Sequence, residues 1–251
     1  MQRRSTCRSI HTITRFAFVE VKTLQGVGNI TAGYLKKMSG ASCEYESHIN
    51  NLFALALRHL GSFKPFNMLD LGCGDGSRTI RVAEYFMIPP DRTHGVDFNQ
   101  SHIDQCRRHF NAHVLDLELD LIPFADQTFD LVVCNQVFEH LKNYQCVLRR
   151  MIGITKPGGY ILIGIPNLAH LINRLYLLVG IQPMCIDIDS SHVRGFTHQS
   201  FKQKLKSELG ITYIDCLGSE LIYPLPLFLA RPLSNLFTGL CAYICYLVRK
   251  N

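Results

Sequence analysis

Leu69-Asp-Leu-Gly-Cys-Gly-Asp-Gly76 is the stretch that decides the fold, because an apolar strand ending in an acid leads directly into three closely spaced glycines. Glycine has no Cβ and adopts positive φ readily, so the chain can turn sharply off the strand and bring a ligand against its backbone amides. Such a turn suits a cofactor of the adenosine type. The alternative is a turn that joins a buried strand to a helix and has no role in binding.

The spacing of the glycines separates two kinds of cofactor site. A dinucleotide-binding turn reads G-x-G-x-x-G, whereas Gly76 comes one residue early for that pattern. Asp70 also argues against a pyrophosphate, since a carboxylate repels an anionic group but attracts the sulfonium and α-ammonium groups of S-adenosylmethionine. The segment resembles the first motif of the class I S-adenosylmethionine-dependent methyltransferases, an acid followed by G-x-G-x-G.

The next predicted strand, Thr93-His-Gly-Val-Asp-Phe98, also ends in an acid. Asp97 follows the glycine turn by about 25 positions, where cofactor-binding units of this type place an acid on the ribose hydroxyls. Two adjacent hydroxyls suit one bidentate carboxylate. The resemblance implies that Asp97 binds the ribose and that Phe98 packs near the adenine. The alternative is that Asp97 caps a helix opening near Ser101.

A third predicted strand, residues 112–115, is followed by Asp116 and Leu117. This is the family's position for an acid that hydrogen-bonds the adenine amine. Because Glu118 and Asp120 alternate with Asp116, any of the three acids could make that contact.

Residues 122–141 carry the second signature: Ile-Pro-Phe-Ala-Asp-Gln-Thr-Phe-Asp-Leu-Val-Val-Cys-Asn-Gln-Val-Phe-Glu-His-Leu. This stretch strongly resembles the small-molecule methyltransferase subgroup called type 11, which includes MetW-like and UbiG-like proteins. The resemblance implies a fourth strand over 129–134, with Asn135 at its carboxyl end under the methionine part of the cofactor. It also implies that Glu139 and His140 open the next helix, and that a Pro-Gly-Gly turn at 157–159 precedes a strand over 161–165.

Taken together, the resemblance implies a set of residues that contact S-adenosylmethionine. They come from the glycine turn and from the ends of the following strands, and they are Asp70, Gly72, Cys73, Gly74, Gly76, Asp97, Phe98, Asp116, Leu117 and Asn135.

The fold class follows from the alternation of short apolar runs with longer helical patterns, which is typical of a parallel sheet with crossover helices. We expect an α/β protein with one Rossmann-like, doubly wound sheet, which is mostly parallel. By resemblance, residues 211–216 and 242–248 are the sixth and seventh strands, and the last strand is antiparallel. With 251 residues, of which 47% are apolar and 18% charged, the chain can bury one large core.

The predicted organisation is a leader over residues 1–30 followed by a methyltransferase domain over 31–251. The leader is rich in arginine among Ser and Thr, which is typical of an organelle transit segment or of a disordered basic tail. A helix over residues 42–60 is expected to cover the sheet edge and, as in related methyltransferases, to close over the cofactor.

Residues 166–197 form a candidate insertion that covers the substrate. Apolar residues recur at helical spacing from Leu168 to Val179, and Gly180 supplies a stop. Such a stripe more often belongs to the core than to a lid. His192 and Arg194 could face the acceptor or cap a helix over 199–209, and we favour capping slightly.

The composition limits the classes of partner and ligand that we expect. The formal net charge of +6 is spread along the chain and outlines no nucleic-acid-binding stripe, so no nucleic acid is expected. Ten irregularly spaced cysteines fit a reducing compartment such as the cytoplasm, with an organelle matrix as the alternative. Cys241 and Cys245 lack the neighbours of a zinc site, and no metal is predicted.

The apolar tail from residue 217 to 248 is broken by charges and prolines. Its longest uncharged run, from Leu233 to Val248, is shorter than a typical membrane span. Peripheral membrane contact through this tail is kept as an alternative.

The predicted function is methyl transfer from S-adenosylmethionine to an oxygen, nitrogen or carbon atom of a small metabolite, lipid or sugar. Displacement at an activated sulfonium needs mainly alignment and exclusion of water, so no catalytic residue is assigned. If the acceptor is a hydroxyl, His140 or His192 could take its proton. The alternatives are a non-catalytic methyltransferase-like binding protein and a nicotinamide-dependent oxidoreductase. Acceptor identity and oligomeric state are left open.

Overall fold

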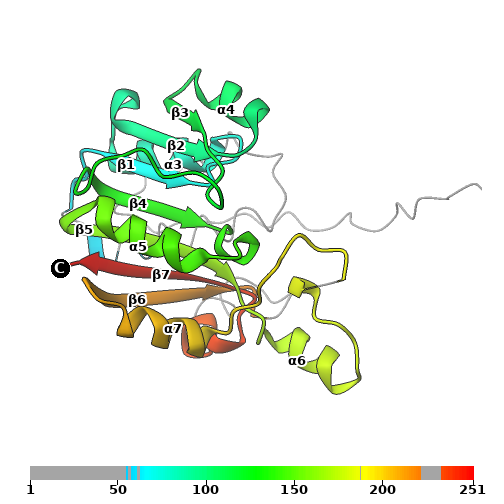
Figure 1. Ribbon diagram of the computed structural model, residues 1–251. Coiled ribbons are helices and arrows are strands. Elements are labelled where there is room, and N and C mark those ends of the chain that lie inside the picture. The colour runs from blue at the N-terminus through cyan, green and yellow to red at the C-terminus, as the bar shows by residue number, and fades with distance from the viewer. Residues whose placement is uncertain (1–54, 56–57, 61–62, 187, 222–232) are drawn as a thin grey trace, which may run out of the picture. The chain divides into compact units, whose positions relative to one another are not determined.

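The computed structural model describes residue 55 and residues 58–60, 63–186, 188–221 and 233–251 (Figure 1). The predicted leader and most of the helix expected over 42–60 lie outside these described residues.

The described residues form one seven-stranded sheet in the order β3-β2-β1-β4-β5-β7-β6 (Figure 1). The pairs from β3 across to β5 are parallel, whereas β7 runs antiparallel to both β5 and β6. The prediction of a mostly parallel sheet with an antiparallel last strand is therefore confirmed. The strands are β1 (Met68–Leu71), β2 (Thr93–Asp97), β3 (Asn111–Val114), β4 (Phe129–Asn135), β5 (Thr155–Pro166), β6 (Ile211–Ser219) and β7 (Tyr243–Lys250).

Helices cover both faces of the sheet, as expected for a doubly wound fold. On one face, α5 and α7 pack against the alternate strand residues that include Leu69, Val132 and Ile163. On the other face, α3 packs against residues such as Met68 and Val133. The α-helices are α3 (Ser77–Phe86), α4 (Gln100–Cys106), α5 (Tyr144–Ile154), α6 (Leu171–Leu178) and α7 (His198–Ser207), and the 3₁₀ turns are η1 (Pro90–Arg92), η2 (Phe138–His140), η3 (Met184–Ile186) and η4 (Thr238–Leu240).

The Pro-Gly-Gly segment lies inside β5, because the strand begins at Thr155 rather than at Ile161. The register with β4 jumps from the pair Phe129 and Thr155 to the pair Leu131 and Tyr160, so the segment between them bulges out of the ladder. A Cβ on Gly159 would lie 2.9 Å from the Asp130 carbonyl oxygen, which explains the glycine in the bulge.

The expectation that the apolar stripe of α6 belongs to the core is wrong. It extends away from the sheet in Figure 1, and Leu175, Leu177 and Leu178 are exposed. Asn173 is its buried residue. A helical period shows that one face of a helix is apolar, but it does not show that a sheet covers that face.

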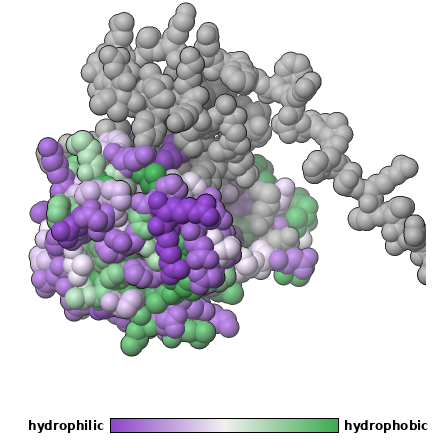
Figure 2. All heavy atoms as spheres, turned by 90° about the horizontal axis from the view of Figure 1, so that it is seen from above, coloured by the Kyte–Doolittle hydropathy of each residue, from purple (hydrophilic) through white to green (hydrophobic). Residues whose placement is uncertain are grey.

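The C-terminal strands account for much of the apolar tail. Strand β7 lies between β5 and β6, and its residues from Ile244 to Val248 are almost completely buried. Within the described residues, no helix is both long enough and apolar enough to cross a membrane. Figure 2, viewed from above Figure 1, shows hydrophilic side chains interleaved with hydrophobic ones on that face.

Candidate cofactor and acceptor site

The turn between β1 and α3 has the conformation that its glycines predict. Gly72, Gly74 and Gly76 have φ values of +76°, +55° and +83°. The amides of Gly72 and Cys73 donate to the Val96 carbonyl oxygen at 2.8 and 3.0 Å, which ties the turn to β2. The turn therefore lies at the carboxyl ends of two parallel strands, where open α/β sheets bind their ligands.

The glycines of the turn have different steric surroundings. A Cβ on Gly72 would lie 2.3 Å from Val137 Cγ2, and one on Gly76 would lie 2.8 Å from Cys106 Sγ. A Cβ on Gly74 would meet no heavy atom of the described residues within 4 Å. Gly72 and Gly76 thus allow close packing, while Gly74 leaves open space that a ligand can approach.

Cys73 offers only its backbone to such a ligand. Its side chain is buried and belongs to a small cluster with Ile103, Cys106, Phe110 and Ala112. Burial raises the pKa of its thiol, which keeps the group protonated and unreactive.

Asp97 holds the turn from the end of β2. Its Oδ2 accepts from the Gly74 amide at 3.0 Å, and its Oδ1 accepts from the Asn99 amide at 2.9 Å. Helix α4 is capped by Asn99, whose side chain accepts from the Ser101 amide at 2.9 Å. The alternative in which Asp97 caps this helix is therefore wrong. A carboxylate has about four acceptor positions, so Asp97 can still accept hydrogen bonds from a ligand.

Two further strand ends carry buried polar atoms that lack hydrogen-bond partners among the described residues. Asp70 in β1 accepts from Thr79 Oγ1 at 2.6 Å through Oδ2, whereas its Oδ1 has no partner among the described residues. Burial raises the pKa of Asp70, and the positive charge of Arg78 opposes that shift. The side-chain amide of Asn135 at the end of β4 has neither donor nor acceptor satisfied within the described structure. Buried polar groups are normally paired, so these atoms indicate a place for a polar ligand.

Arg78 joins the strand ends and was not predicted from the sequence. Its guanidinium donates to the carbonyl oxygens of Asn135 and Gly72 at 3.4 and 3.5 Å. No sequence motif identifies this role, because it depends on how α3 packs beside the ends of β1 and β4.

The residues predicted near the adenine lie at the ends of β2 and β3. Phe98 is exposed beside Asp97. The Oδ1 of Asp116 accepts from the Glu118 amide at 2.8 Å, so this carboxylate shapes its own turn. Leu117 is half-buried against the main core. These residues therefore follow the carboxyl ends of β2 and β3, as the glycine turn follows the carboxyl end of β1.

Glu139 and His140 lie in the 3₁₀ turn η2 after β4, and α5 begins only at Tyr144. The expectation that they open the helix is therefore wrong. The Glu139 side chain is fully buried, and neither carboxylate oxygen accepts a hydrogen bond from another described residue. Burial raises the pKa of Glu139 to about 8, and the Arg78 charge opposes the shift.

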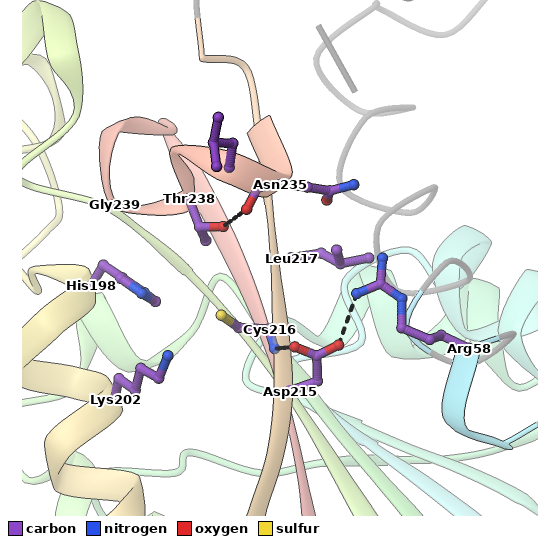
Figure 3. A pocket seen from close by; sticks show the side chains of 10 residues that line it. Arg58, His198, Lys202, Asp215, Cys216, Leu217, Asn235, Thr238 and Gly239 are labelled. Atoms are coloured by element: carbon purple, nitrogen blue, oxygen red, sulfur yellow. Dashed lines mark hydrogen bonds and ion pairs between the residues drawn. The ribbon is translucent and has the colours of Figure 1, made fainter. Parts of the chain in front are cut away.

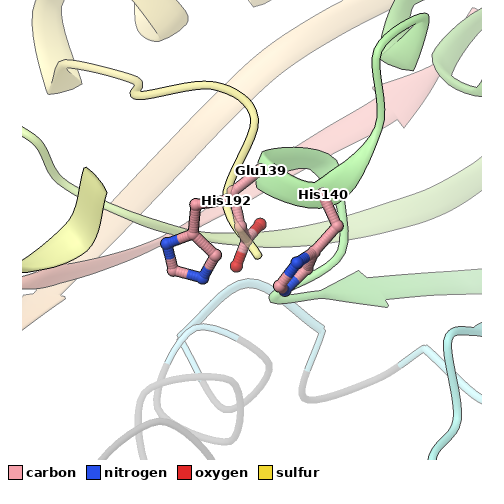
Figure 4. Close-up of side chains that lie close together, drawn as sticks. All are labelled: Glu139, His140 and His192. Carbon is pink, nitrogen blue, oxygen red and sulfur yellow. The ribbon is translucent and has the colours of Figure 1, made fainter. Parts of the chain in front are cut away.

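The segment after α6 returns to this turn and places His192 beside it. The amides of Val193 and Arg194 donate to the Glu139 carbonyl oxygen at 2.9 and 3.2 Å. The imidazole centroids of His140 and His192 are 4.7 Å apart, and Figure 4 shows the Glu139 carboxylate between the two rings.

The favoured expectation that His192 and Arg194 cap the next helix is also wrong. Helix α7 is capped by Thr197, whose side chain accepts from the Ser200 amide. Arg194 instead donates to the Lys142 carbonyl oxygen at 2.9 Å, and its guanidinium lies 5.2 Å from the centroid of the Tyr144 ring.

A separate hollow of about 350 Å³ lies beside β6, which is the strand at the opposite edge of the sheet from β3 (Figure 3). Its lining includes His198 and Lys202 from α7 and Asp215 from β6. Arg58 donates to the Asp215 carboxylate at 2.9 Å. None of the residues predicted to bind the cofactor lines this hollow.

Comparison with known proteins identifies the class. A family model described as a methyltransferase domain matches residues 63–208, which is more than half of the chain. The chain belongs to this methyltransferase-domain family and has the class I fold. The cofactor that this family implies is S-adenosylmethionine. The predicted membership of the class I S-adenosylmethionine-dependent methyltransferases is thereby confirmed.

Two curated relatives are distantly similar to the chain, and their names give different methylated atoms. The chain is 30% identical over 109 residues to norajmaline N-methyltransferase of Rauvolfia serpentina, covering 41% of this chain and 36% of the relative. It is 27% identical over 124 residues to the ubiquinone biosynthesis O-methyltransferase of Coxiella burnetii, covering 47% and 51%. The chain thus spans at most about half the length of these curated relatives.

A solved structure shares the fold across most of the chain. It is a SAM-dependent methyltransferase of Thermotoga maritima, described as a possible histamine N-methyltransferase. Its TM-score is 0.61 at 18% identity, and the match covers 82% of this chain and 89% of that one.

Proposed function

We propose that this protein transfers a methyl group from S-adenosylmethionine to an oxygen, nitrogen or carbon nucleophile of a small molecule. The observation that carries the proposal is the positive-φ turn at 72–76, whose Gly74 amide is held by the Asp97 carboxylate. Open space at Gly74 and the unsatisfied amide of Asn135 fit a cofactor that has both a nucleoside and an amino-acid part.

Each predicted residue has a role in this proposal. Asp97 would accept the ribose hydroxyls, and Phe98, Asp116 and Leu117 would flank the adenine. The Asn135 amide would bind the methionine part, and the lone acceptor of Asp70 would face its positive charge. The backbone of the glycine turn, from Gly72 through Cys73 and Gly74 to Gly76, would line the approach.

S-adenosylmethionine supplies an already activated methyl group, so the chain's own task is to align the acceptor and exclude water. Residues 166–197 are proposed to cover the acceptor, because their returning segment contacts η2 at the same sheet edge. Burial lowers the pKa of His140, so its imidazole is neutral near pH 7 and can take a proton from an acceptor hydroxyl.

A small-molecule acceptor is supported by the relatives, which include a norajmaline N-methyltransferase and a ubiquinone biosynthesis O-methyltransferase by their names. The names of the two relatives differ in the atom methylated, so the proposal keeps both nitrogen and oxygen as target atoms. Acceptor pockets belong to the site rather than to the fold.

Release of S-adenosylhomocysteine tests the proposal. The protein is incubated with S-adenosylmethionine and pools of hydroxyl, amine and carbon-acid acceptors, and Gly74→Ala serves as the matched variant. We expect at least one pool to stimulate release by the wild-type protein and not by Gly74→Ala. A folded wild-type protein that binds the cofactor but releases no product with any pool would instead support a non-catalytic binding protein.

A further inference from the structure

We propose that Glu139, His140 and His192 bind one divalent transition-metal cation, with Zn²⁺ as the ion that the donor set suits best. One ligand atom from each residue lies within 4.8 Å of the other two (Figure 4). A carboxylate with two imidazoles is a ligand set of zinc enzymes, which keep a fourth position for water or substrate. The inference concerns a binding site and does not rest on methyl transfer; with the cation bound, His140 Nε2 is a ligand and does not take the acceptor proton.

The first argument is the buried carboxylate. Glu139 has no exposed surface, and its oxygens accept no hydrogen bond from another described residue. A buried carboxyl group without a partner is costly to ionise, and proteins normally pair its charge or use it to coordinate a metal. Arg78 acts on Glu139 electrostatically, but its guanidinium donates to the Asn135 and Gly72 carbonyl oxygens. A cation between Glu139 and the imidazoles would satisfy the carboxylate directly.

The second argument is the orientation of the imidazoles. The Nδ1 atom of His140 lies 3.2 Å from the Ser191 carbonyl oxygen, and the Nδ1 atom of His192 contacts the Cys185 carbonyl oxygen. A carbonyl oxygen can only accept, so the proton of a neutral His192 ring lies on Nδ1. The same tautomer of His140 donates to the Ser191 carbonyl oxygen, and the Ser191 hydroxyl lies 3.1 Å from the same nitrogen. In this tautomer each Nε2 presents a lone pair. Metal-binding histidines are commonly fixed in this way by a backbone carbonyl on the other nitrogen.

Cation binding would require a modest contraction. Adjacent ligand atoms in a tetrahedral zinc site with bonds of about 2.0–2.1 Å are separated by about 3.4 Å, which is less than the 4.8 Å limit of this cluster. His140 is exposed and His192 half-buried, so both rings can turn toward Glu139. The cation would then fasten the segment after α6 to η2, reinforcing the amide contacts of Val193 and Arg194.

Competition for Zn²⁺ with a chromogenic chelator tests the site on the full chain, prepared without a histidine tag. We expect the wild-type protein to bind one Zn²⁺ per chain at this site. Loss of a neighbouring group that only orients a ligand typically weakens metal binding 10–100-fold. Glu139→Gln and His192→Gln, which remove ligands, should therefore weaken it by at least about 100-fold. His109→Gln removes an exposed histidine after α4 and should leave the affinity unchanged.

Co²⁺ supplies a second readout that adventitious binding would not reproduce. Visible absorption typical of tetrahedral Co²⁺ is expected in the wild-type and His109→Gln proteins and is expected to disappear in Glu139→Gln. Circular dichroism verifies that each variant is folded, and His192→Gln provides a second ligand variant. Equal Zn²⁺ affinity in wild type and Glu139→Gln, or no binding by a folded wild-type protein, would overturn the proposal. Binding that survives both ligand variants would place the cation on other side chains.

Discussion

The proposed cofactor half of the site (the turn at residues 70–76, with Asp97) and the proposed acceptor half (η2 with the segment at residues 188–194) are built in different ways. In the cofactor half, the Gly74 amide and the Asp97 carboxylate are 23 positions apart and are placed by neighbouring parallel strands. In the acceptor half, His140 contacts Ser191, 51 positions away, through a segment that returns from α6. One half is fixed by the ends of sheet strands, and the other by a loop that docks on them.

The difference shows where the fold tolerates change. Side chains cannot be added at Gly72 or Gly76 without clashes, so the cofactor half allows few substitutions. Helix α6 extends away from the sheet and carries exposed apolar side chains. We infer that the chain keeps one cofactor while changes in this segment alter the acceptor. The variants below test the two halves separately.

The largest expected effect is at Gly76, in the cofactor half. An alanine Cβ there would lie 2.8 Å from Cys106 Sγ and 2.9 Å from Phe110 Cε1, at a φ of +83°. Clash and strain together should lower the free energy of unfolding by about 2–4 kcal/mol. Gly180→Ala is the matched control, because it has a φ of +76° with nothing within 4 Å of the added Cβ. Chemical denaturation that finds equal losses would contradict the close packing at Gly76.

Gly74→Ala should separate binding from stability. The added Cβ meets no heavy atom, so strain at a φ of +55° should cost only about 1 kcal/mol. The same methyl group would occupy the space that we assign to the cofactor. Calorimetry should therefore show S-adenosylmethionine binding weakened by more than about tenfold, or about 1.4 kcal/mol. Unchanged affinity would place the cofactor elsewhere.

Asp70→Asn should stabilise the cofactor-free protein as pH rises. Burial raises the pKa of Asp70 above its usual value of 3.8, so the folded state favours the protonated acid. Its stabilising contribution is complete below pH 3.8 and is lost as pH rises toward the folded-state pKa, by at most about 1.4 kcal/mol per pH unit.

Denaturant unfolding of wild type and Asp70→Asn between pH 4 and pH 8 measures this difference. The advantage of the variant should grow with pH and then level off. Asp104→Asn, which removes an exposed carboxylate from α4, corrects for the loss of one negative charge. A difference that is constant with pH would show that Asp70 does not titrate as its burial implies.

The smallest expected effect is at Arg194, in the acceptor half. Arg194→Ala removes the hydrogen bond to the Lys142 carbonyl and the contact with the Tyr144 ring. These contacts should stabilise the docked segment by about 1 kcal/mol. Hydrogen exchange of the amides in residues 188–194 should become faster, with Arg194→Lys intermediate because lysine keeps the charge but not the planar group. Unchanged exchange would mean that the segment docks without Arg194.

The cofactor half could be predicted from the sequence because each residue has a fixed place at a strand end. Strand β2 ends at Asp97 and β4 at Asn135, within one residue of the predicted boundaries. The glycine pattern predicts positive φ without knowledge of any distant contact. Acids and amides that follow buried strands therefore indicate a shared site before the strands are assembled.

The acceptor half could not be predicted in the same way. The apolar stripe of α6 predicts a core helix, but the helix is exposed. Periodicity shows that one face of a helix is apolar and does not show what covers that face. His192 was favoured as a capping residue, but the Thr197 hydroxyl caps α7 instead. The prediction of no metal depends on the lack of a His or Cys cluster that completes a site with Cys241 and Cys245. No spacing rule connects Glu139 with His192. Their proximity depends on the segment that returns after α6.

Binding of S-adenosylmethionine to wild type, Asp97→Asn and Asp104→Asn is the most direct test of the central claim. Calorimetry on the folded proteins compares one carboxylate that holds the Gly74 amide with one that lies exposed on α4. We predict binding by wild type and Asp104→Asn, and binding weakened by at least about tenfold in Asp97→Asn. Equal affinity in all three proteins, or no binding by the wild type, would contradict the assignment of this turn as the cofactor site.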